Sequence, residues 1–239
     1  MSVCVLLSMN VLTAYSVADP DLIMYLPMDE GNGDTVRDMS PNSFQGKIIG
    51  GDFKWVDGQK GAGLELVSGT EVQVPDHALL DGMKALTLEI WVKQDSHQST
   101  GVIQKGTNWP DMSYLAQPWS DQQIYFGVKD TSSRAIAPPG SYPLGEWYHI
   151  AATFDGKTLK LFIDGDEKSE AESPVNQVPD TTTPLQIGNR FTGVIDEFVM
   201  YSRALDASEI QRDMKSVPMS VGARGNLAIA WGRIKLATD

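Results

Sequence analysis

The chain has little of several residue types from which catalytic and stabilising sites are often built. It contains one cysteine, Cys4, and three histidines among its 239 residues. A single cysteine excludes an intramolecular disulfide and every motif that pairs two cysteines for metal or redox chemistry. The sequence also contains no His-Glu-x-x-His, Gly-x-Ser-x-Gly or glycine-rich phosphate-loop pattern, so no common catalytic motif marks it as an enzyme.

Basic residues are scarce relative to acidic ones. The 19 Lys and Arg residues stand against 31 Asp and Glu residues, which gives a formal charge of −12. This surplus of negative charge disfavours binding to the phosphate backbone of a nucleic acid. It fits a soluble protein that binds cations, although acidity alone defines no metal site. With 41% hydrophobic residues, the chain has enough apolar material for a sizeable core.

Charged side chains are absent from the first eighteen residues. The segment 1–18 is mostly apolar and ends in Ser16-Val17-Ala18 before Asp19, which is the pattern of a signal peptide with a small-residue cleavage site. Polar residues interrupt the segment, whereas a membrane-spanning helix needs about 20 continuous apolar residues. We therefore expect a signal peptide, no transmembrane segment in the mature chain, and a secreted or cell-surface protein. A simple N-terminal extension is the alternative.

The strongest local signal is a pair of short runs joined by turn residues. Side chains in 147–154 alternate between two faces, and those in 159–163 do the same. Asp155-Gly156 lies between the runs and Asp164-Gly165 follows them, and both dipeptides are typical of tight hairpin turns. No helical pattern of about 10 to 15 residues separates the runs, as an α/β fold would require. The pattern predicts antiparallel sheet.

Similar short runs, separated by Gly, Asp, Asn and Pro, continue along most of the chain. About a dozen strands need two packed sheets, so we predict an all-β fold, a two-sheet antiparallel sandwich. The stretch 170–184, rich in Pro, Thr and Ser, is expected to be a loop inside the domain. The predicted strands are 22–28, 45–50, 62–67, 70–74, 86–94, 101–105, 112–116, 122–129, 147–154, 157–164, 184–188 and 192–201.

One short helix is predicted near the C-terminus, at 206–215. Asp206 can cap its first turn, and Glu209 follows three residues later, which is the pattern of a capping box. We expect a single domain over 19–215 and a strand-like tail over 216–239. That tail is either an additional edge strand packed on the domain or a surface-attachment segment.

Four groups of residues follow one another in a characteristic order. They are Tyr25–Gly33 with Asp38–Asn42 and Gly46, then Leu86–Val92, the hairpin Glu146–Gly165, and Gly193–Leu205 followed by Ser208–Ile210. In this order they resemble the laminin-G-like jelly rolls of the concanavalin A-like lectin/glucanase superfamily. The resemblance covers roughly Leu22 to Lys215 and implies a jelly-roll sandwich. Lectins, hydrolases and adhesion modules share this fold, so function has to be inferred from sites.

The resemblance also implies a structural calcium ion. Members of the superfamily often hold calcium between their first and last strands, and the matching positions are Asp29 and Asp196, with Glu30 as a substitute if the first strand ends in another register. Calcium takes about six to eight oxygen ligands, so carbonyls and water would complete the shell. Glycines in 60–63 would let such carbonyls approach. The alternative is that Asp29 caps a turn and Asp196 makes a buried hydrogen bond.

Glucan hydrolases of this superfamily carry closely spaced carboxylates on one strand. Here the equivalent strand, 86–93, offers Glu89 alone. Asp95 lies about 20 Å further along an extended strand, beyond the roughly 5 to 9.5 Å that a catalytic pair requires. His149 has no evident nucleophile after it in the sequence. We therefore predict that the protein is not an enzyme, and a polysaccharide-active enzyme with an unrecognised site remains an alternative.

Aromatic residues beside turns are the best ligand-binding candidates. Trp109 and Trp119 lie in predicted loops, where their flat faces could stack on a sugar ring while Asn108, Asp111 and Gln117 hydrogen-bond its hydroxyls. The alternative is that both indoles pack over sheet edges. We predict an exported, non-catalytic module that binds a carbohydrate or an extracellular protein surface. A structural or adhesion module with no small ligand is the competing interpretation.

Overall fold

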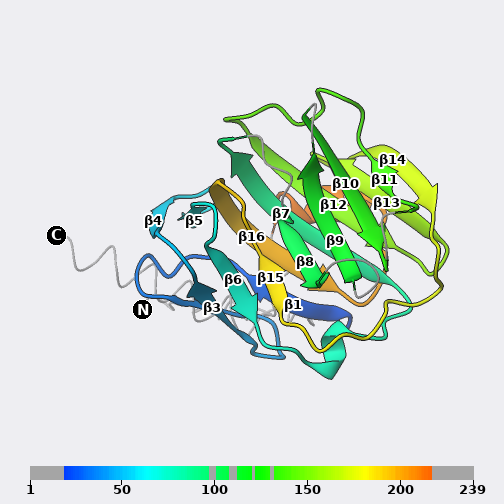
Figure 1. Cartoon of the computed structure of the whole chain (residues 1–239), viewed down its shortest axis with the longest axis horizontal. Helices are drawn as coiled ribbons and strands as arrows, with labels where there is room; N and C mark the ends of the chain where they lie inside the picture. Colours follow the sequence, from blue (N-terminus) through cyan, green and yellow to red (C-terminus); the bar gives the residue numbers. More distant parts are fainter. Residues whose placement is uncertain (1–18, 97–100, 108–111, 120–121, 130–131, 217–239) are drawn as a thin grey trace, which may run out of the picture.

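Alternating side chains organise the described part of the chain into two eight-stranded antiparallel sheets that enclose an apolar core (Figure 1). The computed structural model describes residues 19–96, 101–107, 112–119, 122–129 and 132–216. The predictions for the signal peptide, for the tail from residue 217, and for Trp109, Asn108 and Asp111 lie outside these residues. Within them, the fold confirms the predicted all-β sandwich with one short α-helix.

We call the two sheets A and B. Sheet A has the order β14 (Asp166–Glu172), β13 (Thr158–Ile163), β12 (Trp147–Phe154), β7 (Leu86–Gln94), β16 (Gly193–Tyr201), β5 (Ala62–Leu66) and β4 (Phe53–Asp57), with β1 (Leu22–Leu26) paired to β16. Sheet B has the order β11 (Ala135–Ile136), β10 (Gln123–Val128), β9 (Met112–Trp119), β8 (Ile103–Gly106), β15 (Leu185–Ile187), β6 (Glu71–Val74), β3 (Gln45–Ile49) and β2 (Thr35–Arg37).

The core lies between the sheets because every second side chain points inward. In β7, Leu88, Ile90 and Val92 belong to this core and are almost completely buried. Each such side chain contributes about 1.5 to 3 kcal/mol relative to leaving it exposed. The intervening residues, Glu89 and Trp91, therefore point to the outer face of sheet A.

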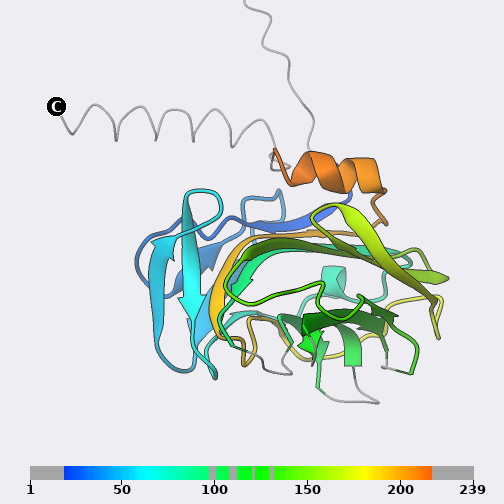
Figure 2. The same ribbon diagram turned by 90° about the horizontal axis from the view of Figure 1, so that it is seen from above.

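The outer faces of the two sheets differ. Helix α1 (Ala207–Asp213) lies outside sheet A (Figure 2), and its Ile210 packs with Ala151, Phe162 and Val199 of that sheet. Among the described residues α1 is the one α-helix, so no described α-helix covers the outer face of sheet B. No helix in the described part of the chain is long and apolar enough to cross a bilayer.

The capping box predicted for α1 is present. The Asp206 side chain accepts hydrogen bonds from the backbone N–H groups of Ser208 (2.8 Å) and Glu209 (2.9 Å). Glu209 in turn accepts from the Asp206 N–H at 3.0 Å. The reciprocal bonds satisfy N–H groups that a helix leaves unpaired at its start, which fixes where α1 begins.

Both predicted hairpin turns are confirmed, but they differ in conformation. Between β12 and β13 only Gly156 has a positive φ, of 88°, and Asp155 instead accepts the N–H groups of Lys157 and Thr158. Between β13 and β14 both Asp164 and Gly165 have positive φ, 53° and 78°. This second turn leads into β14, a strand that the sequence pattern does not predict.

Four strands were not predicted: β2, β4, β11 and β14. Because β14 extends to Glu172, the prediction that 170–184 is entirely loop is wrong at its start. β14 is an edge strand with mostly exposed or half-exposed side chains, so it carries no apolar alternation. Its charged composition is typical of edges that avoid pairing with other chains.

A buried lysine ties together the loops at one end of the sandwich. The Lys105 ammonium lies 2.7 Å from Asp76 and 3.1 Å from Asp81, and it donates to the Thr181 and Thr183 carbonyls. Lys105 is completely buried. Such an ion is tolerated only when it is well paired, so this contact holds both loops in place.

Candidate ligand-binding face and cation site

Trp119 is the described tryptophan most clearly available to a ligand. It is the last residue of β9, and its side chain is 40% exposed. Ala116 of the same strand belongs to the core, so strand alternation directs Gln117 and Trp119 to the outer face of sheet B. The prediction that these two residues lie in a loop is wrong, because β9 continues through both. A strand fixes their positions more firmly than a loop would.

Two further side chains complete a flat surface around this indole. Tyr125 of β10 packs edge-to-face against Trp119, with ring centroids 5.6 Å apart and planes at 68°. The Arg134 guanidinium carbon lies 4.8 Å from the Tyr125 ring centroid and 5.8 Å from that of Trp119. We call Trp119, Tyr125 and Arg134 the aromatic platform. Burial raises the pKa of the Tyr125 phenol while the charge of Arg134 lowers it.

The register of the sheet explains why these residues meet. Tyr125 is paired with Gln117 on one side and with Ile136 on the other, and Trp119 is paired with Gln123. All five side chains therefore emerge on the outer face of sheet B. Two members of the platform thus lie on the neighbouring strands β9 and β10, and Arg134 directly precedes β11 beside them.

A second polar region lies further across the same face. Gln73, Gln186 and Gln104 occupy consecutive paired positions on β6, β15 and β8. The buried Glu71 carboxylate accepts hydrogen bonds from Gln73 at 2.6 Å and from Gln186 at 2.8 Å. Beside them a groove of about 560 Å³ is bounded by residues of β2, β3 and β6 and by Thr182. The outer face of sheet B therefore offers amide groups as well as aromatic rings.

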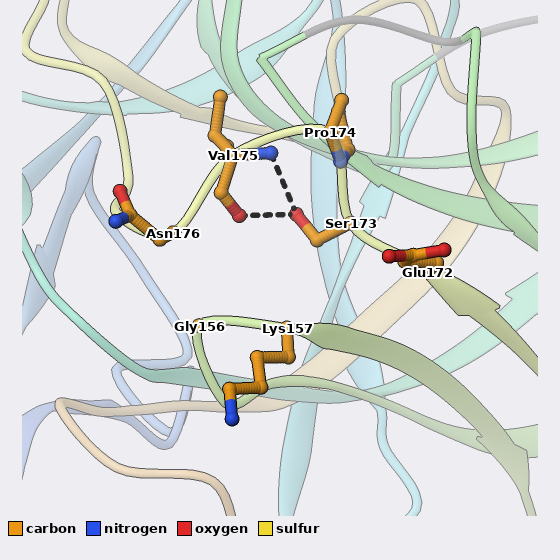
Figure 3. Close-up of a pocket in the computed structure, with 7 residues that line it drawn as sticks. All are labelled: Gly156, Lys157, Glu172, Ser173, Pro174, Val175 and Asn176. Carbon is orange, nitrogen blue, oxygen red and sulfur yellow. Dashed lines mark hydrogen bonds between the residues drawn. The ribbon is translucent and has the colours of Figure 1, made fainter.

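A pocket at the end of β14, the edge strand of sheet A, has different chemistry (Figure 3). It lies between the 156–157 turn and the 172–176 segment, and its seven lining residues include no aromatic ring. The Ser173 hydroxyl donates to the Val175 carbonyl at 2.8 Å and accepts from the Val175 N–H at 3.3 Å. This hydroxyl is occupied within the loop, which leaves the side chains of Lys157, Glu172 and Asn176 for a ligand. The pocket fits a stacked sugar less well than the aromatic platform.

The carboxylates predicted to hold calcium approach a single loop. Asp196 lies within β16, and its Oδ2 accepts the Lys60 N–H at 2.9 Å. Asp29 follows β1, and its Oδ1 accepts the Ala62 N–H at 2.8 Å. β1 and β16 are paired, so the first and last strands are neighbours as expected. Both carboxylates thus contact the 58–62 segment.

Glycines in that segment make the approach possible. A Cβ atom on Gly61, whose φ is 68°, would lie 2.2 Å from Asp29 Oδ1, and one on Gly58 would lie 2.7 Å from Asp196 Oδ2. Real Cβ atoms do not tolerate such contacts, so any other residue would displace the carboxylates. Glu30 differs, because its Oε1 accepts the Arg37 N–H at 2.9 Å on β2.

The electrostatics of Asp196 are unfavourable in the absence of a cation. Its side chain is completely buried, and its Oδ1 has no hydrogen-bond partner among the described residues. Burial, together with the nearby Glu197 and Asp29 carboxylates, raises the pKa of Asp196 to about 8. In the described part of the chain no three Asp, Glu, His or Cys side chains form a metal-binding cluster. Carbonyls and water would have to supply most ligands.

Glu89 and His149 form a buried pair on the outer face of sheet A. Their Oε2 and Nε2 atoms are 3.2 Å apart. Burial raises the pKa of Glu89 well above its usual value and lowers that of His149 to about 3, so burial disfavours the charged form of both groups. Glu89 is paired in register with Ala151 and Val199, which pack under α1. A polysaccharide outside the protein could not reach this carboxyl group.

Tyr125 and Arg134 were not identified from the sequence. Alternation within 122–129 places Tyr125 on one face of a strand, but it does not say which strand lies beside it. Arg134 lies directly before β11, a strand of two residues that is too short to show a periodic pattern. Their contact with Trp119 depends on the register of β9, β10 and β11, which the sequence pattern does not determine.

Comparison with known proteins gives a family and a set of relatives. A laminin G family model, described as the concanavalin A-like lectin/glucanases superfamily, matches residues 67–211. Pappalysin-1 of Mus musculus is 26% identical over 161 residues, which is 55% of this chain and 10% of the relative. Pappalysin-1 of Homo sapiens is 23% identical over 158 residues, with the same coverage. The chain therefore spans about a tenth of the length of these relatives.

Solved structures support the same fold. Domain 4 of AbnA, an extracellular arabinanase from Geobacillus stearothermophilus in complex with arabinotriose, has a TM-score of 0.65 and 20% identity, covering 80% of this chain and 97% of that one. Botulinum neurotoxin type C, described as interacting with two ganglioside molecules, has a TM-score of 0.64 and 15% identity, covering 82% and 51%. At these identities the similarity establishes the sandwich fold alone.

Proposed function

Because this chain belongs to the concanavalin A-like lectin/glucanase superfamily, we propose that it is a non-catalytic module that binds a glycan through the outer face of sheet B. The observation that carries the proposal is the exposed Trp119 indole, held by Tyr125 on a strand. A flat apolar ring beside a few polar groups is the usual design of a site for a small polar ligand. Gln117 and Gln123 supply amides next to the ring.

The relatives favour a glycan over a protein surface as the ligand. The arabinanase domain is seen with arabinotriose, and the neurotoxin is described with gangliosides. Another solved structure of similar fold is the binding domain of botulinum neurotoxin DC in complex with rat synaptotagmin II. A protein ligand is therefore the second candidate. We infer action outside the cell from the signal-peptide pattern of residues 1–18, and the extracellular arabinanase supports this inference.

A non-catalytic role is supported by the position of Glu89. The carboxyl groups of a glycosidase must flank the bond that they cleave. Glu89 is completely buried beneath the α1 side of sheet A, on the opposite face of the sandwich from Trp119. A glycan bound at the aromatic platform would therefore not contact it.

We further propose that Asp29 and Asp196 hold a structural calcium ion. Two carboxylates that approach one glycine-containing loop suit a hard cation, which prefers oxygen ligands. A cation would also offset the cost of the buried Asp196 carboxylate. Bound there, calcium would link β1, β16 and the 58–62 loop and so stabilise the fold. Glu30 is a poorer ligand because Arg37 already uses one of its oxygens.

The function is tested by measuring binding of the wild type and of Trp119→Ala to a glycan array. Trp147→Ala is the matched control, since Trp147 is a half-buried tryptophan of sheet A. We expect selective glycan binding that Trp119→Ala abolishes and Trp147→Ala preserves, with circular dichroism showing both variants folded. Glycan binding that survives in Trp119→Ala would contradict the proposed site. No binding by the wild type would favour the adhesion module without a small ligand.

A further inference from the structure

The aromatic platform contains a cation, Arg134, beside the ring on which a ligand would stack. The Arg134 guanidinium is 4.8 Å from the Tyr125 ring and 5.8 Å from the exposed Trp119 ring. Arg134 is half-exposed, so its side chain is partly open to solvent. A sugar ring stacked on Trp119 would therefore have a planar array of N–H donors beside it.

Arg134 lacks the ionic partners that Arg203 and Arg212 have. Arg203 is bonded to Asp19 and Glu209, at 2.5 and 2.8 Å. Within the described residues, by contrast, no carboxylate lies within ion-pair distance of Arg134. Its cationic charge is thus balanced by the faces of aromatic rings, which attract a cation but leave its N–H edges free for a stronger acceptor.

The backbone around Arg134 is anchored on both sides. The Ser133 hydroxyl donates to the Glu172 carbonyl, and the Ile136 N–H donates to the Ser169 hydroxyl oxygen at 3.1 Å. These bonds connect the β11 edge of sheet B to β14 of sheet A. The backbone that carries Arg134 is therefore fixed next to β10 before any ligand arrives, which reduces the entropy lost on binding.

Because the protein as a whole is acidic, a cation at the platform indicates which chemical class of ligand the site would bind. With a formal charge of −12, the chain repels an acidic ligand at long range. A neutral sugar would need only amides and an aromatic ring, both of which are present without Arg134. A fork of N–H donors instead matches the geometry of a carboxylate, to which it can form two parallel hydrogen bonds.

From this geometry we propose that the aromatic platform recognises a sugar that carries a carboxylate, with the ring stacked on Trp119 and the carboxylate bonded to the Arg134 guanidinium. The proposal rests on the proposed function, because it assigns a ligand class to the same site. Two kinds of sugar have this chemistry, uronic acids in polysaccharides and sialic acids at glycan ends. The experiment must separate them.

Isothermal titration calorimetry with two matched pairs of ligands tests the proposal. Trigalacturonate is compared with α-1,4-linked galactotriose, and 3′-sialyllactose with its methyl ester, because the members of each pair keep the same sugar rings and differ in whether they carry free carboxylates. We expect the acidic member of one pair to bind at least about tenfold more tightly, as for a charge-assisted hydrogen bond. The pair that shows the preference identifies the source of the carboxylate.

Variants then assign the preference to Arg134. Arg134→Gln should reduce it to near unity while leaving affinity for the neutral member little changed, and Arg134→Lys should retain only part of it. Arg37→Gln is the charge-matched control, since Arg37 is an exposed arginine on β2 at the other edge of sheet B. Arg37→Gln should leave the preference intact.

The outcomes separate the two proposals. Equal affinity for acidic and neutral members, with binding still lost in Trp119→Ala, would overturn the acidic-sugar inference and leave glycan binding standing. A preference that persists in Arg134→Gln, or that falls equally in Arg37→Gln, would also overturn the inference. Failure of all four sugars to bind would overturn the inference as well. If the glycan array also showed no binding by the wild type, the proposed function would fail too.

Discussion

Replacement of Asp196 by asparagine separates the cost of a buried charge from the gain of a bound cation. The asparagine has nearly the same shape and can still accept the Lys60 N–H, but it cannot ionise. In the presence of a chelator, the folded wild type keeps Asp196 protonated up to about pH 8, whereas an unfolded chain ionises it near 3.8. Between these values the folded state therefore binds more protons than the unfolded state.

The sign and the size of the effect follow from this difference. Where the folded state binds more protons, the free energy of unfolding falls as the pH rises, by about 1.4 kcal/mol per pH unit for one group. Between pH 5 and pH 8 the wild type should lose roughly 3 to 4 kcal/mol through Asp196. Asp196→Asn has no ionisable group at this position, so its free energy of unfolding does not fall in this way. Without calcium, the variant should therefore become more stable than the wild type as the pH rises.

Calcium should reverse the order of stability. An ion that binds only the folded state stabilises it by RT ln(1 + [L]/Kd), about 2.7 kcal/mol at a hundredfold excess over Kd. Because calcium competes with the proton on Asp196, its effect on the wild type should grow between pH 6 and pH 8. The asparagine variant lacks the carboxylate and should gain little at any pH.

Urea unfolding followed by tryptophan fluorescence measures these free energies. Wild type and Asp196→Asn are compared at pH 5, 6, 7 and 8, in EGTA and in calcium chloride. A difference between the two proteins that stays constant with pH in EGTA would refute the titration of Asp196. Equal stabilisation of both by calcium would refute Asp196 as a ligand.

Three further changes test other parts of the structure. Lys105→Met leaves Asp76 and its neighbours facing an apolar side chain, so it should lower the free energy of unfolding in urea by about 3 to 5 kcal/mol. A decrease below about 0.5 kcal/mol would show that the ion pair is dispensable. Gly61→Ala should destabilise the fold more than Gly69→Ala. Both glycines have positive φ, but only a Cβ on residue 61 would clash with the Asp29 carboxylate. Equal effects would refute the close approach of Asp29 to Gly61. Burial raises the pKa of Glu89 and so favours its uncharged carboxyl, which a glutamine amide resembles, so Glu89→Gln should change the urea midpoint little. A loss of several kcal/mol would mean that Glu89 is ionised in the fold.

The sequence predicted those elements whose signals are local. The two Asp-Gly turns and the capping box at Asp206 each depend on a few adjacent residues, and all are present. β14 was missed because an edge strand buries neither face, so its side chains show no alternation. The shortest strands, β2 and β11, contain too few residues for a periodic pattern to appear.

The candidate site shows the same limit. Trp119 could be found because tryptophan beside turn residues is informative by itself, although its strand was predicted to end too early. Arg134 carries no such signal, and its importance comes only from packing against Tyr125 across β10 and β11. Contacts between strands depend on register, which short alternating segments leave open. Sequence patterns therefore located the anchor of the site but not the charge beside it.

The two proposed sites lie on different sheets, and this determines how they can influence each other. Asp196 belongs to β16 of sheet A, whereas Trp119 belongs to β9 of sheet B, with the apolar core between the sheets. A calcium ion at Asp196 could not contact a sugar stacked on Trp119. The core is close-packed and transmits little unless a segment has two alternative packings. Calcium should therefore change glycan binding only by changing the fraction of folded protein, and the carboxylate preference should depend on Arg134 rather than on a bridging cation.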